Sequence, residues 1–198
     1  MKTPLLALAV TALLSACAIP YETPEARANI ERDLTLSADE IVTIEQTNWC
    51  FFDYGDISPC RMAQGLGVLT RTGLVLAFYK GGHYQQVEVI KPSDVQCAHL
   101  QSGRETFDPF YLFSARWVGM LAVAAPQEVA IRKKRQFLSV LVPAGTETFV
   151  GANGNFIEAT GRKNYSAAPV PGTSVYVGTS EDINQMVNPC TIGKSRRP

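Results

Sequence analysis

The feature that most constrains this fold is a run of three β-prone segments separated by two short turns that contain glycine. The segments are Leu66–Thr70, Leu74–Tyr79 and Tyr84–Ile90, and the turns are Arg71–Gly73 and Lys80–His83. Short apolar runs bounded by glycine-containing turns are typical of antiparallel hairpins. The middle of the chain is therefore expected to form a three-stranded meander.

A second stretch nearer the C-terminus has the same organisation. A turn at Pro143–Thr146 separates Phe137–Val142 from Glu147–Ala152, and Asn153-Gly154 then precedes Asn155–Thr160. Asn-Gly is a strong hairpin signal, because both central residues of a type I′ turn need positive φ. A second three-stranded meander is expected here.

Between the two predicted meanders lies the least polar stretch of the body, Phe110–Ala125. Asp108 and Pro109 are suited to the start of a helix, and Pro126 would end it. Its large apolar residues at helical spacing are Phe110, Phe113, Trp117 and Leu121. We expect a buried helix, although a run this apolar also fits a strand. A functional interpretation would make it a membrane-inserted hairpin or one wall of a lipid-binding groove.

Four shorter segments complete the secondary-structure expectation. Glu25–Arg32, preceded by Pro24, is expected to be a surface helix, and Ile41–Ile44 a strand because it is β-branched, although the acids before it also fit a helix cap. Ala167–Gly172 contains two prolines and is expected to be a loop. Ser180–Val187 begins with a serine and two acids, which favours a short helix.

These elements predict a single α+β domain, mainly antiparallel β, with two three-stranded meanders and two or three helices. In outline this arrangement resembles a small barrel of the pleckstrin-homology type. The segment Lys91–Gln136 departs from that pattern, and the resemblance does not imply a function.

The N-terminus has the composition of an export signal. Lys2 is followed by the apolar run Leu5–Leu14, which is too short to span a bilayer. The sequence Leu14-Ser15-Ala16-Cys17 resembles the lipobox of bacterial lipoproteins, in which the cysteine receives a diacylglyceryl group and becomes the mature N-terminus. The resemblance implies lipid attachment at Cys17, and Ala18 implies sorting to the outer membrane, facing the periplasm. The alternative is an ordinary cleaved signal in which Cys17 is incidental.

The expected organisation follows from that site. Residues 1–16 would be the signal peptide, residues 17–24 a lipidated tether, residues 25–190 one globular domain and residues 191–198 a basic tail. The 18 basic and 18 acidic residues balance, so no nucleic-acid partner is expected. The chain carries no signature of a cofactor.

Five cysteines leave four for pairing once Cys17 carries lipid. Three pairings are possible in the oxidising periplasm. Cys50 and Cys60 flank a turn-rich segment and are the favoured local pair, which leaves Cys97 with Cys190. The alternative, a metal site built from Cys50, Cys60, Cys97 and His99, lacks the paired spacing of zinc knuckles. No metal site is expected.

Chemistry-bearing residues are few. His83 lies on a predicted turn and His99 follows Cys97 closely, and no catalytic motif accompanies either. Asp53 and Asp56 could be imagined as calcium ligands or an acid–base pair, but turn chemistry accounts for them.

The one concentration of charge is Arg132, Lys133, Lys134 and Arg135. We expect a solvated loop that protects a sheet edge from pairing with other chains. The alternative is a patch that binds an anionic partner, such as phospholipid headgroups or an acidic protein.

These observations favour a membrane-anchored envelope lipoprotein that binds or scaffolds another envelope component, either a protein or an anionic lipid. One alternative is a periplasmic hydrolase that uses His83 or His99. Another is a lipid carrier or sensor with a groove lined by Phe110, Phe113 and Trp117.

Overall fold

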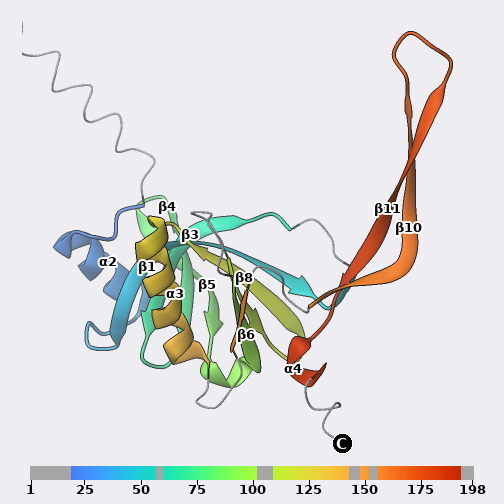
Figure 1. The fold of residues 1–198 in the computed structure, drawn as a ribbon. Helices are drawn as coiled ribbons and strands as arrows, with labels where there is room; N and C mark the ends of the chain where they lie inside the picture. Colours follow the sequence, from blue (N-terminus) through green and yellow to red (C-terminus); the bar gives the residue numbers. More distant parts are fainter. Residues whose placement is uncertain (1–18, 57–59, 102–108, 143–147, 152–155, 193–198) are drawn as a thin grey trace, which may run out of the picture.

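The computed structural model describes residues 19–56, 60–101, 109–142, 148–151 and 156–192, and most of them form β-strands (Figure 1). The strands are β1 (Ile41–Asp53), β2 (Gly55–Asp56), β3 (Ala63–Thr70), β4 (Leu74–Lys80), β5 (His83–Ile90), β6 (Cys97–Gln101), β7 (Phe110–Phe113), β8 (Trp117–Val123), β9 (Thr148–Gly151), β10 (Ile157–Pro169) and β11 (Tyr176–Met186). The helices are α2 (Pro24–Leu34), α3 (Gln127–Leu141) and α4 (Pro189–Ile192), and η1 (Pro92–Asp94) is a short 3-10 helix. The expected α+β, mainly antiparallel fold is confirmed.

The strands belong to two sheets. In the described part of the chain, the larger sheet has eight strands in the order β5-β4-β3-β1-β8-β7-β6-β9, and the smaller has the order β10-β11-β2. The long strand β1 lies in the middle of the larger sheet, where it pairs with β3 on one side and β8 on the other. The pair of β6 and β9 is parallel, whereas the other pairs described here are antiparallel.

The first predicted meander is confirmed as β3-β4-β5, with turns close to the expected positions. In the first turn, the Thr70 N–H donates to the Gly73 carbonyl at 2.8 Å. In the second, Gly81 and Gly82 have φ of 60° and 84°, a region that glycine adopts without a steric penalty.

The second predicted meander is wrong. Phe137–Val142 is mostly helical, because it forms the end of α3. The strand β9 does exist, but it pairs in parallel with β6 instead of forming a hairpin. The turns predicted at Pro143–Thr146 and Asn153-Gly154 lie outside the described residues.

The helix predicted at Phe110–Ala125 is also wrong, because β7 and β8 form there as an antiparallel pair. Both strands are largely buried on both faces. A strand buried on both faces loses the alternation of polar and apolar residues that identifies strands in a sequence.

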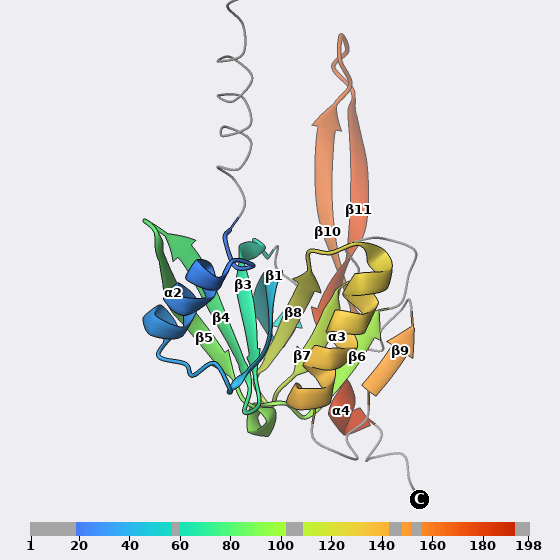
Figure 2. The same cartoon turned by 90° about the vertical axis from the view of Figure 1, so that its left-hand side faces the viewer.

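Two helices cover opposite faces of the sheet, as the alternation along β4 shows. Leu74 and Leu76 belong to a core cluster with Phe137 of α3, whereas Val75 and Ala77 belong to a second cluster with Ile30 of α2. The first cluster draws residues from β1 and β3 to β8, so the sheet curls around α3 (Figure 2).

Helix α2 confirms the surface helix expected before the first strand. The Thr23 hydroxyl caps its first turn by accepting from the Ala26 N–H at 3.1 Å, and Pro24 occupies the first turn. The segment expected to be a tether is partly docked, since Ile19 and Tyr21 pack against the second core cluster. The strand expected at Ile41–Ile44 is confirmed as the start of β1.

The region after residue 156 differs from its prediction. The helix expected at Ser180–Val187 is wrong, because β11 continues through Met186. The loop expected at Ala167–Gly172 begins later, since β10 continues to Pro169. A helix does follow the strand, but it is the single turn α4.

The four cysteines of the body lie at disulfide distance in the expected pairs. The Cα atoms of Cys50 and Cys60 are 6.2 Å apart, and those of Cys97 and Cys190 are 5.7 Å apart. The alternative metal site would need Cys50, Cys60 and Cys97 together, whereas the structure places Cys97 against Cys190 instead. Among the described residues there is no cluster of potential metal ligands. Cys17 and the expected signal peptide lie outside those residues. None of the described helices has the length and apolar character needed to cross a membrane.

Candidate interaction surface

The most distinctive element of this molecule is a two-stranded arm formed by β10 and β11, which projects away from the body (Figures 1 and 2). Pairing runs from Ile157 opposite Met186 to Pro169 opposite Tyr176. Nearly every side chain of the arm is exposed, because neither face of its distal part packs on the body. An arm of this kind presents two sheet edges and two faces to the surroundings.

Local interactions hold the two strands of the arm together. At mid-length, Lys163 Nζ lies 3.6 Å from Asp182 Oδ1, and the Ser166 and Thr179 hydroxyls are 2.7 Å apart. At the tip, the Val170 N–H donates to the Val175 carbonyl at 2.9 Å. These contacts are solvent-exposed, so each contributes little stability.

The base of the arm is fixed to the body. Phe156 and Met186, on either side of the base, are buried in a third cluster with Cys97, Phe113 and Val118. The arm therefore begins at a packed junction, although its distal half is solvated.

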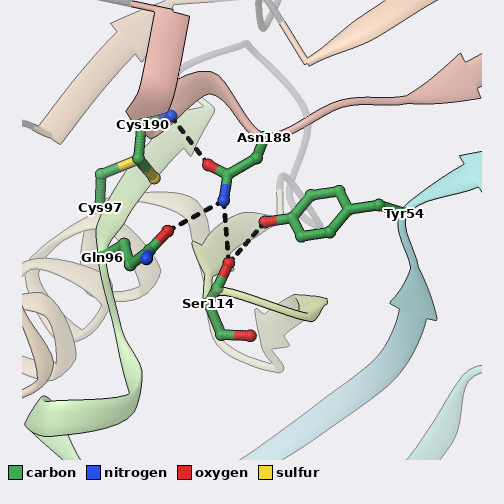
Figure 3. Close-up of a disulfide and its surroundings, with 6 residues drawn as sticks. All are labelled: Tyr54, Gln96, Cys97, Ser114, Asn188 and Cys190. Atoms are coloured by element: carbon green, nitrogen blue, oxygen red, sulfur yellow. Dashed lines mark hydrogen bonds between the residues drawn. A yellow bond between two sulfur atoms is a disulfide. The ribbon is translucent and has the colours of Figure 1, made fainter. Parts of the chain in front are cut away.

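A polar network reinforces this junction (Figure 3). The Asn188 amide donates to Gln96 Oε1 at 2.9 Å and to the Ser114 carbonyl at 3.0 Å, and its oxygen accepts from the Cys190 N–H at 2.9 Å. The Tyr54 hydroxyl donates to the same Ser114 carbonyl at 2.8 Å, and burial raises the pKa of Tyr54 to about 12. With the Cys97–Cys190 pair, the network fixes the C-terminal end of β11 to β6 and β7.

The distal half of the arm has an unusual surface. No charged residue occurs from Asn164 to Ser180, yet Tyr165 is 76% exposed and Tyr176 is 68% exposed. The register and the alternation of strand side chains place Tyr165, Ala167, Gly178 and Tyr176 on one face. A shallow pocket is lined by residues 165–167 and 178–180, and a Cβ built at Gly178 would meet no other atom within 4 Å. The arm thus carries two large aromatic rings beside an open hollow.

The basic cluster predicted as a loop lies on α3 instead, and its four members do not form one exposed patch. Lys134 is only 2% exposed, and Lys133 forms an ion pair with Glu45 of β1 and donates to the Thr43 hydroxyl at 3.1 Å. Only Arg132 and Arg135 of the cluster are exposed. The described structure therefore offers two of the four cations to an anionic partner.

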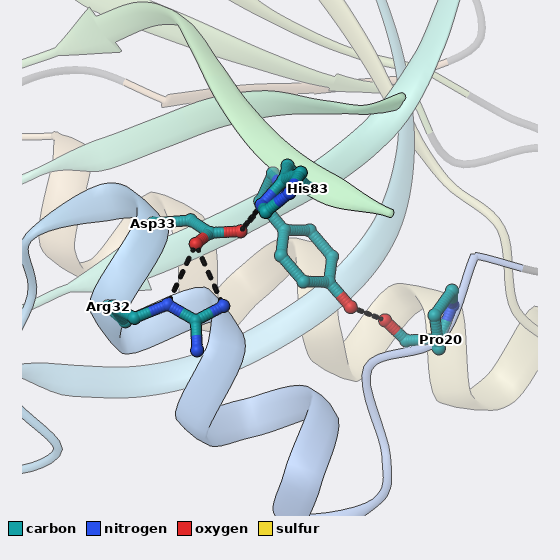
Figure 4. Close-up of polar contacts among 5 residues, drawn as sticks. Pro20, Arg32, Asp33 and His83 are labelled. Carbon is teal, nitrogen blue, oxygen red and sulfur yellow. Dashed lines mark hydrogen bonds and ion pairs between the residues drawn. The ribbon is translucent and has the colours of Figure 1, made fainter. Parts of the chain in front are cut away.

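The two histidines lie in different surroundings. His83, at the start of β5, is exposed, and its Nδ1 lies 3.3 Å from Asp33 Oδ2 (Figure 4). His99, on β6, is buried beside the rings of Tyr111 and Phe156.

Asp33 holds the polar contacts between α2 and β5. Its carboxylate accepts from the Tyr84 N–H at 3.0 Å and from Arg32 Nε at 3.2 Å. These bonds, the backbone bond from Tyr84 foremost, lower the pKa of Asp33 below its ordinary value. His83 contacts the same carboxylate, so its surroundings indicate a structural role in joining β5 to α2.

The other candidate residues lie in structural positions. Phe110 and Phe113 are fully buried in β7, so they are part of the core and not the wall of an open groove. Trp117 is partly buried and meets the Phe51 ring edge to face, with the two ring planes at 90°. Asp53 ends β1 and is exposed, whereas Asp56 lies in β2, which pairs with β11 at the base of the arm.

Sequence reasoning missed the aromatic residues of the arm, Tyr165 and Tyr176. One signal was present, since the charge-free run Asn164–Ser180 contains β-branched and aromatic residues on both sides of a Pro-Gly turn.

Comparisons with known proteins do not place this chain in a family. No protein-family model matches it, and no curated protein matches it. Among solved structures, it is similar to Vav1 inhibited by an allosteric inhibitor, with 12% identity, a TM-score of 0.41 and coverage of 50% of this chain and 26% of that one. It is also similar to an apo activated truncation of Vav1, with 12% identity, a TM-score of 0.43 and coverage of 68% and 38%. The chain thus spans well under half the length of either Vav1 structure.

Proposed function

We propose that this protein is a lipid-anchored module of the bacterial cell envelope that binds another envelope protein through the β10–β11 arm. The anchor would be Cys17, as the lipobox resemblance implies. The observation that carries the binding role is the arm itself, which presents Tyr165, Tyr176 and their neighbours to solvent.

The composition of the arm supports protein binding. Tyrosine beside serine, glycine and asparagine is the combination that antibody loops use, because the ring provides contact area at a low cost in conformational entropy. Aromatic anchors also dominate the energetics of protein interfaces. The distal arm has both tyrosines, three serines and two glycines between Ser166 and Ser180, and no charge that would have to be desolvated.

The free edges of the arm provide a second means of recognition. Only Gln185 and Met186 of β11 pair with β2, so most of the outer edge of β11 is available among the described strands. A partner strand could add to such an edge through main-chain hydrogen bonds, with side chains providing the specificity.

Photo-crosslinking in intact cells tests the binding role. A photoreactive residue at position 176 is expected to give one defined adduct, and the same residue at Val87, an exposed position on β5, is expected not to. Tyr165→Ser should weaken the adduct from position 176 about tenfold or more, as loss of an aromatic anchor does. Equal adducts from positions 176 and 87 would refute the proposal.

Fractionation tests the anchor. The wild-type protein is expected in the membrane fraction, and Cys17→Ser is expected to release it into the soluble periplasmic fraction. Retention of the Cys17→Ser variant in the membrane would contradict lipid anchoring at this residue.

A further inference from the structure

The first described residues of the chain are attached to the body by a hydrogen bond and by apolar packing (Figure 4). The Tyr84 hydroxyl donates a hydrogen bond to the Pro20 carbonyl, and Tyr84 itself is buried. On either side of Pro20, Ile19 and Tyr21 pack against the core cluster that lies under α2. The chain is thus held to the body from its first described residue.

The covalent distance to the proposed lipid is short. Only Ala18 separates Cys17 from Ile19. Consecutive Cα atoms are about 3.8 Å apart, so the Cα atoms of Cys17 and Ile19 are at most about 7–8 Å apart. A lipid on Cys17 would therefore hold this part of the body at the membrane surface, without a long flexible linker.

The turn between β4 and β5 lies beside the contact of Tyr84 with Pro20, and its residues are suited to a membrane interface. Tyr79 is 38% exposed, and its ring lies 4.9 Å from that of Tyr84. Phe78 is 37% exposed, but it points to the other face of β4 and stacks on Trp49. Lys80 follows at the tip and is exposed. Aromatic rings settle at the level of lipid headgroups, and an adjacent lysine favours the anionic phosphates there.

We propose that the β4–β5 turn is seated in the headgroup layer of the bilayer next to the lipid anchor. This inference rests on the anchoring at Cys17 put forward above. One exposed turn binds a membrane weakly, but the anchor makes the second contact intramolecular, so a weak contact suffices.

The placement of the arm agrees with this seat. In Figure 1, α2 and the first described residues lie at one side of the molecule and the arm lies at the other. Figure 2 views the molecule from the α2 side, and the arm is the more distant element. The arm is therefore well separated from α2 and from the first described residues, so contact of the β4–β5 turn with a membrane would not involve the arm.

Depth-dependent fluorescence quenching tests whether the β4–β5 turn lies in the headgroup layer. The full lipidated protein is reconstituted in vesicles of phosphatidylethanolamine and phosphatidylglycerol that contain a lipid with a nitroxide near the headgroup. A polarity-sensitive dye is attached at Tyr79→Cys in one sample and at Tyr165→Cys in the other, because both replace an exposed tyrosine. The dye at position 79 should lose about half or more of its emission, as expected for a residue at the interface, and the dye at position 165 should lose little.

The possible outcomes separate the two proposals. Vesicles that bind no protein would refute the anchor and, with it, the seat. Protein that is bound to vesicles but shows no quenching at position 79 would overturn the seat and leave the anchor intact. Quenching at position 165 instead of 79 would overturn the seat and identify the arm as a lipid contact.

Discussion

Removing the Cys97–Cys190 disulfide should destabilise the protein much more than removing the Cys50–Cys60 disulfide. Both pairs are covalent links between residues of the described body, but they close loops of very different length, with sequence separations of 93 and 10. The longer link also joins the end of the arm to β6, where Asn188 binds Gln96 and Ser114.

The magnitude follows from the conformational entropy of the unfolded chain. In the chain-entropy model, a link stabilises the folded state by restricting the unfolded chain, and the effect grows with the logarithm of loop length. The long loop gives about 4.7 kcal/mol and the short loop about 2.7 kcal/mol. We therefore expect the double variant Cys97→Ser/Cys190→Ser to lose about 2 kcal/mol more unfolding free energy than Cys50→Ser/Cys60→Ser.

Urea denaturation followed by tryptophan fluorescence measures this difference. Both double variants would be made in a Cys17→Ser background, which removes the proposed site of lipid attachment. With a slope of about 2 kcal/mol per molar urea, the two midpoints should differ by about 1 M. Equal midpoints, or a lower midpoint for Cys50→Ser/Cys60→Ser, would refute the loop-length argument.

Two further predictions concern the larger sheet and its contact with α2. An ideal Cβ at Gly65 would overlap the Ala77 carbonyl oxygen, so Gly65→Ala should lower the unfolding free energy by about 2 kcal/mol. A Cβ at Gly178, on the open arm, would meet no other atom, so Gly178→Ala should change the unfolding free energy by less than about 0.5 kcal/mol. Chemical denaturation of the two variants measures both values. Because the folded-state pKa of Asp33 is lowered, its contribution is present above its ordinary pKa and is lost as pH falls through the folded value. Wild type should therefore lose its thermal advantage over Asp33→Asn below about pH 4, and a constant advantage down to pH 2 would contradict the role of the carboxylate.

The sequence was informative wherever a pattern had one interpretation. The β3-β4-β5 meander could be predicted because glycine-containing turns separate short β-prone runs, and α2 could be predicted from Pro24 and the acids that follow it. The cysteine pairs were also accessible, because Cys50 and Cys60 are close in sequence and leave one remaining pair.

Helix α3 was missed because a lysine interrupts its apolar face. Ala130, Phe137, Leu138 and Leu141 are buried at helical spacing, but Lys134 occupies the position between them and is buried as well. A cation at that position made the segment resemble a solvated loop. Lys134 shows that a long amphipathic side chain can lie on the inner face of a helix, which sequence periodicity does not anticipate.

The arm was missed for the opposite reason. Strand β11 is exposed on both faces, so it has no buried face to produce an alternating pattern. The serine and acids at its centre, Ser180 to Asp182, instead matched a helix start. The candidate interaction surface could not be recognised until the register of β10 and β11 was known.

If the chain is exported, as proposed above, the order of its disulfides bears on how it would mature. Each cysteine of the body pairs with its next neighbour along the sequence, Cys50 with Cys60 and Cys97 with Cys190. A chain that crosses a membrane from its N-terminus releases its thiols in that same order. An oxidase that joins thiols as they emerge would therefore produce the native pairs directly, without an isomerase to correct them. The second link would have to wait until nearly the whole chain had emerged, so the arm could be clamped only in the last step of maturation.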